Sequence, residues 1–270
     1  MKILYYPQQP AGGQRVFHYL KNLGIEWTGD IHDDGITHIH HYNYLNRIDI
    51  PLIEFKAFRE AGVQIINDTL LNIKKDYIDD VFYDIFGYSI RIDPTTHVGY
   101  CGIKTSQNAV HGLKMLECPI QPYEVDTIPR VSNNGEPHYR IYMKLIDTRI
   151  SPTIIRDFRI VVMGGEIVYL FEKHLDSSCL AHPQKGKYFK AYGYKHMNKF
   201  FSEDEVKKIY QYIQRTNTNF AEIDILRSNY DGKMYIIDEN PVPGGGVFNA
   251  MDNKDEVIQY LSECYKRCFI

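Results

Sequence analysis

The chain has 270 residues and a mass of 31.6 kDa, which is long enough to bury a sizeable hydrophobic core without help from metals or disulfides. Hydrophobic residues make up 44% and charged residues 24%, an ordinary globular composition that excludes bulk disorder. The net charge of -3 shows no basic excess, so neither a nucleic acid nor a membrane surface is expected as a partner.

Cysteine usage and hydropathy indicate the compartment. The chain contains five cysteines and no Cys-x-x-Cys pair, which argues against a disulfide scaffold or a zinc ribbon. No apolar stretch is long enough to span a bilayer, and the first residues do not resemble a secretion signal. We therefore expect a cytoplasmic protein. Its oligomeric state stays open, with a homodimer among the options.

Short apolar runs alternate with helical patterns over the first third of the chain. Strands are predicted at residues 2–6, 35–42 and 63–66, and helices at residues 14–23, 51–61 and 68–86. Strands that alternate with helices are typical of a parallel sheet covered by helices. We expect residues 1–88 to form an N-terminal parallel α/β domain.

The middle of the chain has a different pattern. Strands are predicted at residues 89–92, 98–104 and 139–146, and a short helix at residues 106–115. This pattern predicts a small α+β unit at residues 89–146, not a continuation of the first sheet.

The last third contains two hairpin signals. The first joins strands at residues 154–163 and 166–172 through Gly164 and Gly165, which suit a two-residue turn with positive φ. The second joins strands at residues 220–226 and 233–238. Between the hairpins, Ser202 and Glu205 form a capping box that opens a helix to about residue 215. An amphipathic helix is predicted at residues 254–268.

The strongest chemical pattern lies in the last hairpin. Alternation along the first strand places Glu222 and Asp224 on one face, and Asp238 and Asn240 share a face on the partner strand. Antiparallel pairing would gather Asp224, Asp238 and Asn240 in one patch. Two carboxylates and a carboxamide are hard oxygen ligands that suit Mg²⁺, and the cation relieves the repulsion between the carboxylates. The alternative is a solvated polar face.

Residues 221–245, AEIDILRSNYDGKMYIIDENPVPGG, resemble the C-terminal signature of the ATP-grasp superfamily, which includes carboxylate–amine ligases. The resemblance implies an α/β protein with the ATP-grasp fold, in which two α+β lobes, residues 89–146 and 147–270, grip ATP. It also implies that Asp224, Asp238 and Asn240 bind Mg²⁺ carried by ATP. Most members have Glu where Asp238 stands. Glu239 is expected to point away from the metal.

A second segment resembles the same superfamily. Residues 156–162, RDFRIVV, followed by two glycines, are similar to the hairpin whose arginine stabilises phosphate and the tetrahedral anion. Arg156 and Arg159 lie three residues apart, so on a strand they point to opposite faces. We expect Arg159 to enter the site as the catalytic residue, because its fork of N–H donors complements spreading phosphoryl charge.

The resemblance also implies the ATP contacts near the phosphates. Lys75 and Lys104 match the two lysines that contact the α- and β-phosphates, and Lys74 is a near-equal candidate for the first of them. The superfamily's glycine-rich loop is replaced after Lys104. There, Asn108 and His111 are the expected phosphate contacts at a helix N-terminus.

Residues 142–147 match the connector whose backbone reads adenine and whose acidic residue holds the ribose. Met143, Lys144 and Asp147 are therefore expected on the nucleoside side of the ATP site. Without the other motifs, this segment would be interpreted simply as a buried strand.

The implied activity is that of a Mg²⁺- and ATP-dependent carboxylate–amine ligase that works through an acyl phosphate and releases ADP and phosphate. Transfer of the γ-phosphate to a small-molecule or saccharide acceptor is the alternative, and a nucleotide-gated binding protein is a third hypothesis. The acceptor stays open among small molecules, peptides and saccharides.

Three other signals receive a weaker interpretation. His38 and His40 share a strand face, but no other ligand accompanies them, so a polar strand end near the substrate cleft is expected rather than a zinc site. Residues 10–15 lack a dinucleotide-binding glycine pattern, and Arg15 is expected either to meet a substrate carboxylate or to be solvated. Residues 176–198 are expected to form an irregular basic loop, which either closes over ATP, recognises an anionic acceptor or is a solvated surface segment.

Overall fold

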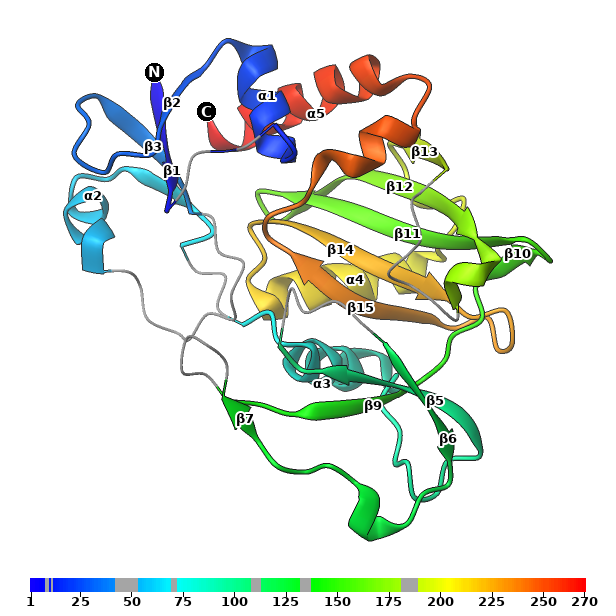
Figure 1. The fold of residues 1–270 in the computed structure, drawn as a ribbon. Helices are drawn as coiled ribbons and strands as arrows, with labels where there is room; N and C mark the ends of the chain where they lie inside the picture. The colour runs from blue at the N-terminus through cyan, green and yellow to red at the C-terminus, as the bar shows by residue number, and fades with distance from the viewer. Residues whose placement is uncertain are drawn as a thin grey trace.

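The chain folds around a large antiparallel sheet, with an N-terminal parallel sheet on one side and a small lobe on another (Figure 1). The computed structural model describes residues 1–7, 10, 12–41, 53–68, 72–107, 113–131, 137–180 and 189–270. The predicted phosphate contacts Asn108 and His111 lie outside the described residues.

The N-terminal sheet is parallel throughout and has the strand order β2-β1-β3-β4, as the alternating pattern predicted. Its strands are β1 (Lys2–Tyr6), β2 (Glu26–Thr28), β3 (Ile36–His41) and β4 (Gln64–Ile66). Helix α1 (Arg15–Leu23) ends at Gly24, whose φ of 63° suits glycine. The three-residue strand β2 was not predicted. The helix predicted at residues 51–61 is shorter, with η1 (Ile53–Phe55) leading into α2 (Lys56–Glu60).

The small lobe is an antiparallel sheet in the order β6-β5-β9. Its elements are β5 (Gly99–Thr105), β6 (Lys114–Cys118) and β9 (Arg140–Lys144), with η2 (Pro122–Glu124) and the pair β7 (Arg130–Val131) and β8 (Pro137–His138) beside them. Two predictions were wrong here. Lys114 and Met115 belong to strand β6 and not to a helix, and residues 89–92 form no strand beyond one bridge from Arg91 to Met143.

The central sheet has the order β13-β12-β11-β14-β15, with β10 paired to β11. Its strands are β10 (Arg149–Ser151), β11 (Ile154–Met163), β12 (Glu166–Asp176), β13 (Lys190–Tyr194), β14 (Phe220–Arg227) and β15 (Met234–Asn240). Gly164 and Gly165 make the predicted turn with φ of 63° and 80°. The predicted capping box opens α4 (Glu203–Thr216). Strand β13 corrects the expectation of a wholly irregular segment at residues 176–198, which also contains η3 (Ser177–Leu180).

The two faces of the central sheet have different neighbours. Alternate residues such as Phe158, Ile160 and Ile223 pack in one core with α4 and α3 (Lys75–Phe86). On the opposite face, residues such as Val161 and Phe171 pack in a second core with α1, η5 (Gly245–Ala250) and α5 (Lys254–Phe269). That face also carries polar side chains, among them Arg159 and Asp224, which are paired across β11 and β14.

Helix α3 begins at Lys75, seven residues after the predicted start, and packs against β15 and α4. It therefore contacts the central sheet, although it was expected within the first unit. The division of the chain at residues 88 and 146 stays a prediction.

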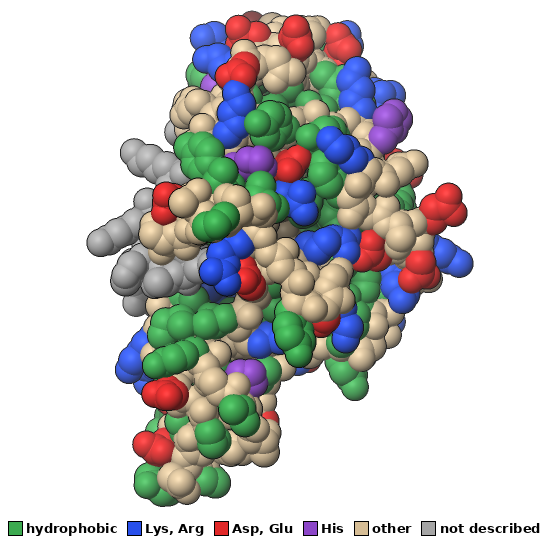
Figure 2. Space-filling model, turned by 90° about the vertical axis from the view of Figure 1, so that its right-hand side faces the viewer, with side chains coloured by type: hydrophobic (Ala, Val, Ile, Leu, Met, Phe, Trp, Pro, Cys, Tyr) green, Lys and Arg blue, Asp and Glu red, His purple; other side chains and the backbone are tan. Residues whose placement is uncertain are grey.

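The surface offers no simple guide to a partner. Figure 2 shows Lys and Arg side chains interspersed with Asp and Glu over the described part of one face. None of the helices in the described ranges combines the length and hydrophobicity needed to cross a bilayer.

Candidate active site

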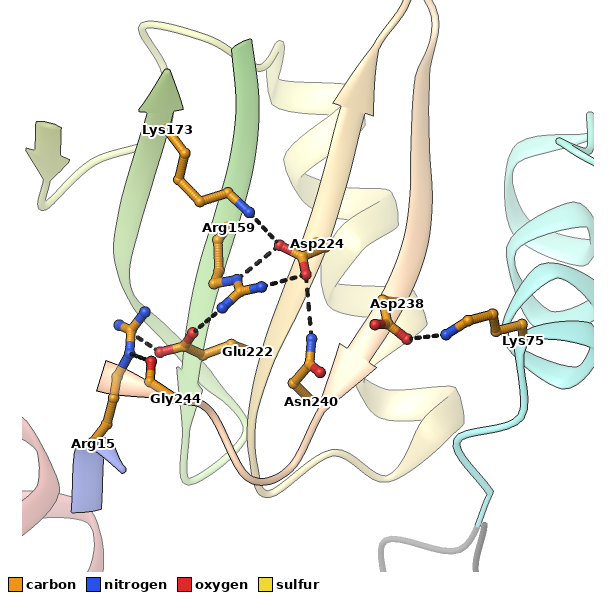
Figure 3. A network of polar contacts seen from close by, with 9 residues as sticks. All are labelled: Arg15, Lys75, Arg159, Lys173, Glu222, Asp224, Asp238, Asn240 and Gly244. Atoms are coloured by element: carbon orange, nitrogen blue, oxygen red, sulfur yellow. Dashed lines mark hydrogen bonds and ion pairs between the residues drawn. The ribbon is translucent and has the colours of Figure 1, made fainter. Parts of the chain in front are cut away.

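Strands β14 and β15 bring the three predicted metal ligands together. Asp224 and Asp238 are directly paired across the two strands, and Nδ2 of Asn240 donates to Oδ2 of Asp224 at 3.3 Å (Figure 3). A register irregularity follows Asp224. Glu239 lies on the opposite face, as expected, where Thr218 and Tyr212 donate to its buried carboxylate. Burial raises the pKa of Glu239 to about 7.

Arg159 reaches the same carboxylate from β11. Its Nε and Nη2 donate to the two oxygens of Asp224 at 2.7 and 2.6 Å, in the bidentate geometry that a guanidinium favours. Arg156 points to the other face, where its nearest acidic atom belongs to Glu172 at 3.6 Å. The structure therefore places Arg159, and not Arg156, beside Asp224 and Asn240.

Lys173 on β12 completes the surroundings of Asp224. Its Nζ donates to Oδ1 of Asp224 at 2.7 Å, and the residue is only 2% exposed. Burial alone would raise the pKa of Asp224, but the charges of Arg159 and Lys173 outweigh burial and bring it well below the ordinary value. Asp224 therefore stays ionised.

Arg15 occupies a position that sequence reasoning did not predict. It is fully buried, and its Nη1 lies 2.5 Å from Oε1 of Glu222, so it is neither solvated nor open to a substrate carboxylate. Glu222 also lies 3.4 Å from Nη1 of Arg159. Burial raises the pKa of Glu222, and the two arginines partly offset that effect.

A cavity of about 300 Å³ separates the small lobe from the central sheet. Its apolar lining includes Ile90, Leu113, Met143, Ile146, Ile155, Leu226 and Ile237. Its charged lining includes Lys75, Lys104, Lys144, Asp147, Arg149 and Asp157. The volume and the mixture of apolar walls with a few polar groups are typical of a small-molecule site.

Lys75 and Lys104, the predicted phosphate contacts, line this cavity, and Lys75 differs from Lys74 in its partner. Nζ of Lys75 lies 2.7 Å from Oδ1 of Asp238, whereas Nζ of Lys74 donates to the carbonyl of Pro137 at 3.2 Å. Burial and the neighbouring ammonium of Lys75 lower the pKa of Lys104. A bound anion would relieve this concentration of positive charge.

The other predicted nucleotide contacts also line the cavity. The ammonium group of Lys144 lies 4.5 Å from the centre of the Tyr235 ring, and burial lowers its pKa. Asp147 already accepts from Arg149, with Nε at 2.9 Å from Oδ1, and this hydrogen bond lowers the pKa of Asp147. Met143 is on the cavity wall beside them.

Comparison with solved structures identifies the fold. No family model and no curated protein matches the sequence. The ATP-grasp ligase PsnB, solved with a phosphomimetic variant of its minimal precursor, Mg and ADP, has a TM-score of 0.61 at 11% identity, over 100% of this chain and 98% of its own. D-alanine–D-alanine ligase from Bacillus anthracis has a TM-score of 0.54 at 10% identity, over 99% and 95%. The macrocyclase MdnC from Microcystis aeruginosa MRC, bound to the precursor peptide MdnA, gives 0.53 at 12% identity, over 99% and 100%.

The chain has the ATP-grasp fold. The predicted fold class is thereby confirmed, since the N-terminal parallel sheet and the antiparallel sheets that follow it occur in the expected order. The substrates in the names of those ligases are the ligases' own and are not assigned to this chain.

Within the ATP-grasp fold of this chain, sequence reasoning missed the buried Lys173, the partly buried Asp157 and the burial of Arg15 against Glu222. Lys173 and Asp157 are paired across β12 and β11, and both share the face that carries Arg159. Burial raises the pKa of Asp157, and Thr148 lies 3.4 Å from its carboxylate. Asp157 is two residues before Arg159 on the same strand, so side-chain alternation would have placed both on one face. The register of the β11–β12 hairpin would then have placed Lys173 opposite Asp157. Arg15 gave no such signal, because its partner Glu222 is 207 positions later in the chain.

The expectation of a polar strand end near the substrate cleft was wrong for His40, and for the partly exposed His38 it stays a prediction. His40 is fully buried and stacks against Tyr5 and Tyr265, with its Nδ1 3.0 Å from the Tyr265 hydroxyl. It belongs to the core between β3 and α5 and not to a cleft. Burial lowers the pKa of His40 to about 3, so it stays neutral.

The donor chemistry of the site suits Mg²⁺ and ATP. Among the described residues, no group of three or more His, Cys, Asp or Glu could hold a metal, so a transition-metal cage is not indicated. The two carboxylates and the carboxamide form a smaller oxygen set, of the kind that holds Mg²⁺ when phosphate and water supply the other ligands. Lysine and arginine side chains already form ion pairs with both carboxylates, so positive charge is favourable beside these two groups.

Proposed function

We propose that this protein is an ATP-dependent carboxylate–amine ligase. The observation that carries the proposal is the cluster in which Arg159 contacts Asp224, Asp224 faces Asp238 and Asn240, and Asp238 contacts Lys75 at the wall of the cavity. The cluster places oxygen ligands for a cation beside N–H donors for phosphate. Phosphoryl transfer from ATP depends on that combination of positioning and charge stabilisation.

Each part of the site takes a separate role in this proposal. Asp224, Asp238 and Asn240 would hold Mg²⁺, which supplies positive charge to the phosphate oxygens when it is bound. Lys75 and Lys104 would donate to the phosphates.

The nucleoside would occupy the apolar part of the cavity, with Met143 and Lys144 beside adenine. Asp147 would accept from the ribose. Its present pairing with Arg149 is half-exposed, so exchanging that partner for ribose costs little.

The reaction proceeds in two balanced steps. An oxygen of the substrate carboxylate attacks the γ-phosphorus of ATP, and the bond from that phosphorus to the β–γ bridging oxygen breaks. ADP departs, and the substrate becomes an acyl phosphate. The amine nitrogen then attacks the acyl carbon, the carbon–oxygen bond to phosphate breaks, and the nitrogen loses a proton. Arg159 would stabilise the negative charge that develops in both steps, because its guanidinium is a fixed fork of donors.

The acceptor is open within this proposal. Two of the ligases with the same fold were solved with precursor peptides, and a third is named for D-alanine. Peptides with side-chain or terminal carboxylates and free amino acids are therefore the first compounds to test, followed by saccharides.

A matrix of carboxylates and amines tests the proposal. Release of ADP should require one member of each class, and a carboxylate labelled with ¹⁸O should transfer one labelled oxygen to the released phosphate. A phosphorylated product formed without an amine would favour the kinase alternative. Binding of ATP with no turnover against the whole matrix would favour a binding protein.

A further inference from the structure

Arg15 is the largest fully buried side chain of the described residues, although it begins a helix of the N-terminal domain. Its Nη1 pairs with Glu222 at 2.5 Å, and its Nε donates to the carbonyl of Gly244 at 3.2 Å (Figure 3). Its guanidinium carbon lies 4.4 Å from the centre of the Phe171 ring and 4.9 Å from that of Phe248. Every one of these contacts is internal, so Arg15 does not touch the cavity.

Glu222 lies between two arginines and is only 1% exposed. Its Oε1 forms an ion pair with Nη1 of Arg15 at 2.5 Å, without the geometry of a hydrogen bond, while its Oε2 is 3.4 Å from Nη1 of Arg159. Arg159 has its short contacts with Asp224 instead, at 2.6 and 2.7 Å. Among the described contacts of Arg159, those through Nε and Nη2 to Asp224 are therefore the shorter ones.

An uncompensated charge in the protein interior is costly in free energy. A buried carboxylate that loses its cationic partner therefore tends to form an ion pair with another cation nearby. Without Arg15, Glu222 would be left with Arg159 as its ion-pair partner among the described residues. Glu222 and Asp224 would then compete for one guanidinium. We propose that Arg15 is a positioning residue, which compensates the charge of Glu222 so that Arg159 stays on Asp224.

The backbone fixes Arg15 in this place. Its N–H donates to the carbonyl of Pro243 at 3.1 Å, and the N–H of Gly245 donates to the carbonyl of Gly13 at 2.7 Å. A Cβ on Gly245 would lie 3.2 Å from Nε2 of His18, so the close approach of the two loops favours glycine there. The loop before α1 and the loop after β15 thus form one unit that sets Arg15 against Glu222.

This inference rests on the proposed role of Arg159, and it predicts a specific pattern of nucleotide binding. The variant Arg15→Met keeps most of the side-chain volume and removes the charge. It should weaken binding of Mg·ADP·aluminium fluoride, which mimics the transferred phosphoryl group, by about 10-fold or more, as loss of a supporting partner commonly does. Binding of Mg·AMPPNP, the ground-state mimic, should change much less.

A matched control and a rescue separate positioning from general loss of structure. Arg227 is on β14, like Glu222, and pairs with Glu205 at 2.9 Å, so Arg227→Met removes a more exposed ion pair of the same strand. It should leave the ratio of the two dissociation constants unchanged. The double variant Arg15→Met/Glu222→Gln should restore the ratio, because no charged carboxylate then competes for Arg159. Equal weakening of both analogues, or no restoration in the double variant, would overturn the proposal.

A second measurement needs no nucleotide. The Nε–H group of Arg159 can be followed by NMR, and its exchange with water should be slow in the native protein and much faster in Arg15→Met. In Arg15→Lys, which keeps the charge, the exchange rate of this group should remain close to that of the native protein. This variant is the one to compare with the native protein if Arg15→Met does not fold. Unchanged exchange in Arg15→Met, or fast exchange already in Arg15→Lys with its charge intact, would refute positioning. If the native protein binds neither analogue, the proposed function fails, while the exchange result still decides whether Arg15 positions Arg159.

Discussion

Replacement of Lys75 should affect the two ligands of the proposed site in opposite directions. Its side chain is 9% exposed and lines the cavity, with Nζ 2.7 Å from Oδ1 of Asp238. In the protein without nucleotide, the ammonium group would compete with a divalent cation for Asp238. In the complex with ATP, the same ammonium group would contact phosphate. Lys75→Met keeps the length of the side chain and removes both interactions.

The expected size of the effect follows from the contact. A hydrogen bond between charged groups contributes about 1.5–3 kcal/mol, which corresponds to roughly a 10- to 100-fold change in an equilibrium constant. Without nucleotide, Lys75→Met should therefore bind Mn²⁺, used as a probe for Mg²⁺, about 10-fold more tightly or better. Binding of AMPPNP in the presence of Mn²⁺ should weaken by a factor of similar size.

Both constants are measurable on the full chain. Electron paramagnetic resonance counts free Mn²⁺, and titration calorimetry gives the affinity for AMPPNP. Lys74→Met is the matched control, because Nζ of Lys74 contacts the carbonyl of Pro137 and no carboxylate of the site. It should change neither constant by more than about 2-fold, the usual effect of a surface substitution. Similar behaviour of the two variants, or weaker binding of Mn²⁺ to nucleotide-free Lys75→Met, would refute the reasoning.

Three further predictions concern the cluster around Asp224. Asp238→Asn should retain the native circular dichroism spectrum and lose Mg²⁺-dependent ATP turnover, and normal turnover would contradict the metal assignment. Arg159→Lys keeps the charge but loses the bidentate fork, so steady-state kinetics should show a larger loss in kcat than in ATP affinity. The pKa of Asp224 is lower in the folded protein than its ordinary value of 3.8, so its stabilising contribution is present above that pH and is lost as the pH falls further. Urea unfolding of Asp224→Asn and of the native protein should be compared between roughly pH 5 and pH 2.5, the window that this shift defines. As the pH falls, the free energy of unfolding should decrease less steeply in Asp224→Asn than in the native protein. Equal slopes would count against the ion pairs.

Local chemistry explains which elements were predictable from the sequence. The turn at Gly164 and Gly165 and the capping box of Ser202 and Glu205 depend on neighbours in the chain, and both occur as predicted. Strand β13 was missed because its pairing with β12 is a tertiary interaction. Gly193 within it lies so close to the Tyr169 ring that a Cβ would overlap the hydroxyl.

The candidate site was predictable to the extent that strand alternation defines it. Asp224, Asp238 and Asn240 share one face of a hairpin, so the sequence was enough to bring them together. Lys173 required the register of a neighbouring hairpin. Arg15 required the packing of the N-terminal domain against the loop after β15, which no local pattern encodes.

We propose that the cavity between the small lobe and the central sheet holds Mg·ATP, with its phosphates directed toward Arg159. A crystal structure of the full chain with AMPPNP and Mg²⁺ tests this claim most directly. We expect adenine beside Met143 and Lys144, and Mg²⁺ bound by Asp224, Asp238 and Asn240. A nucleotide bound elsewhere, or Mg²⁺ bound to phosphate without any of these three side chains, would contradict the account.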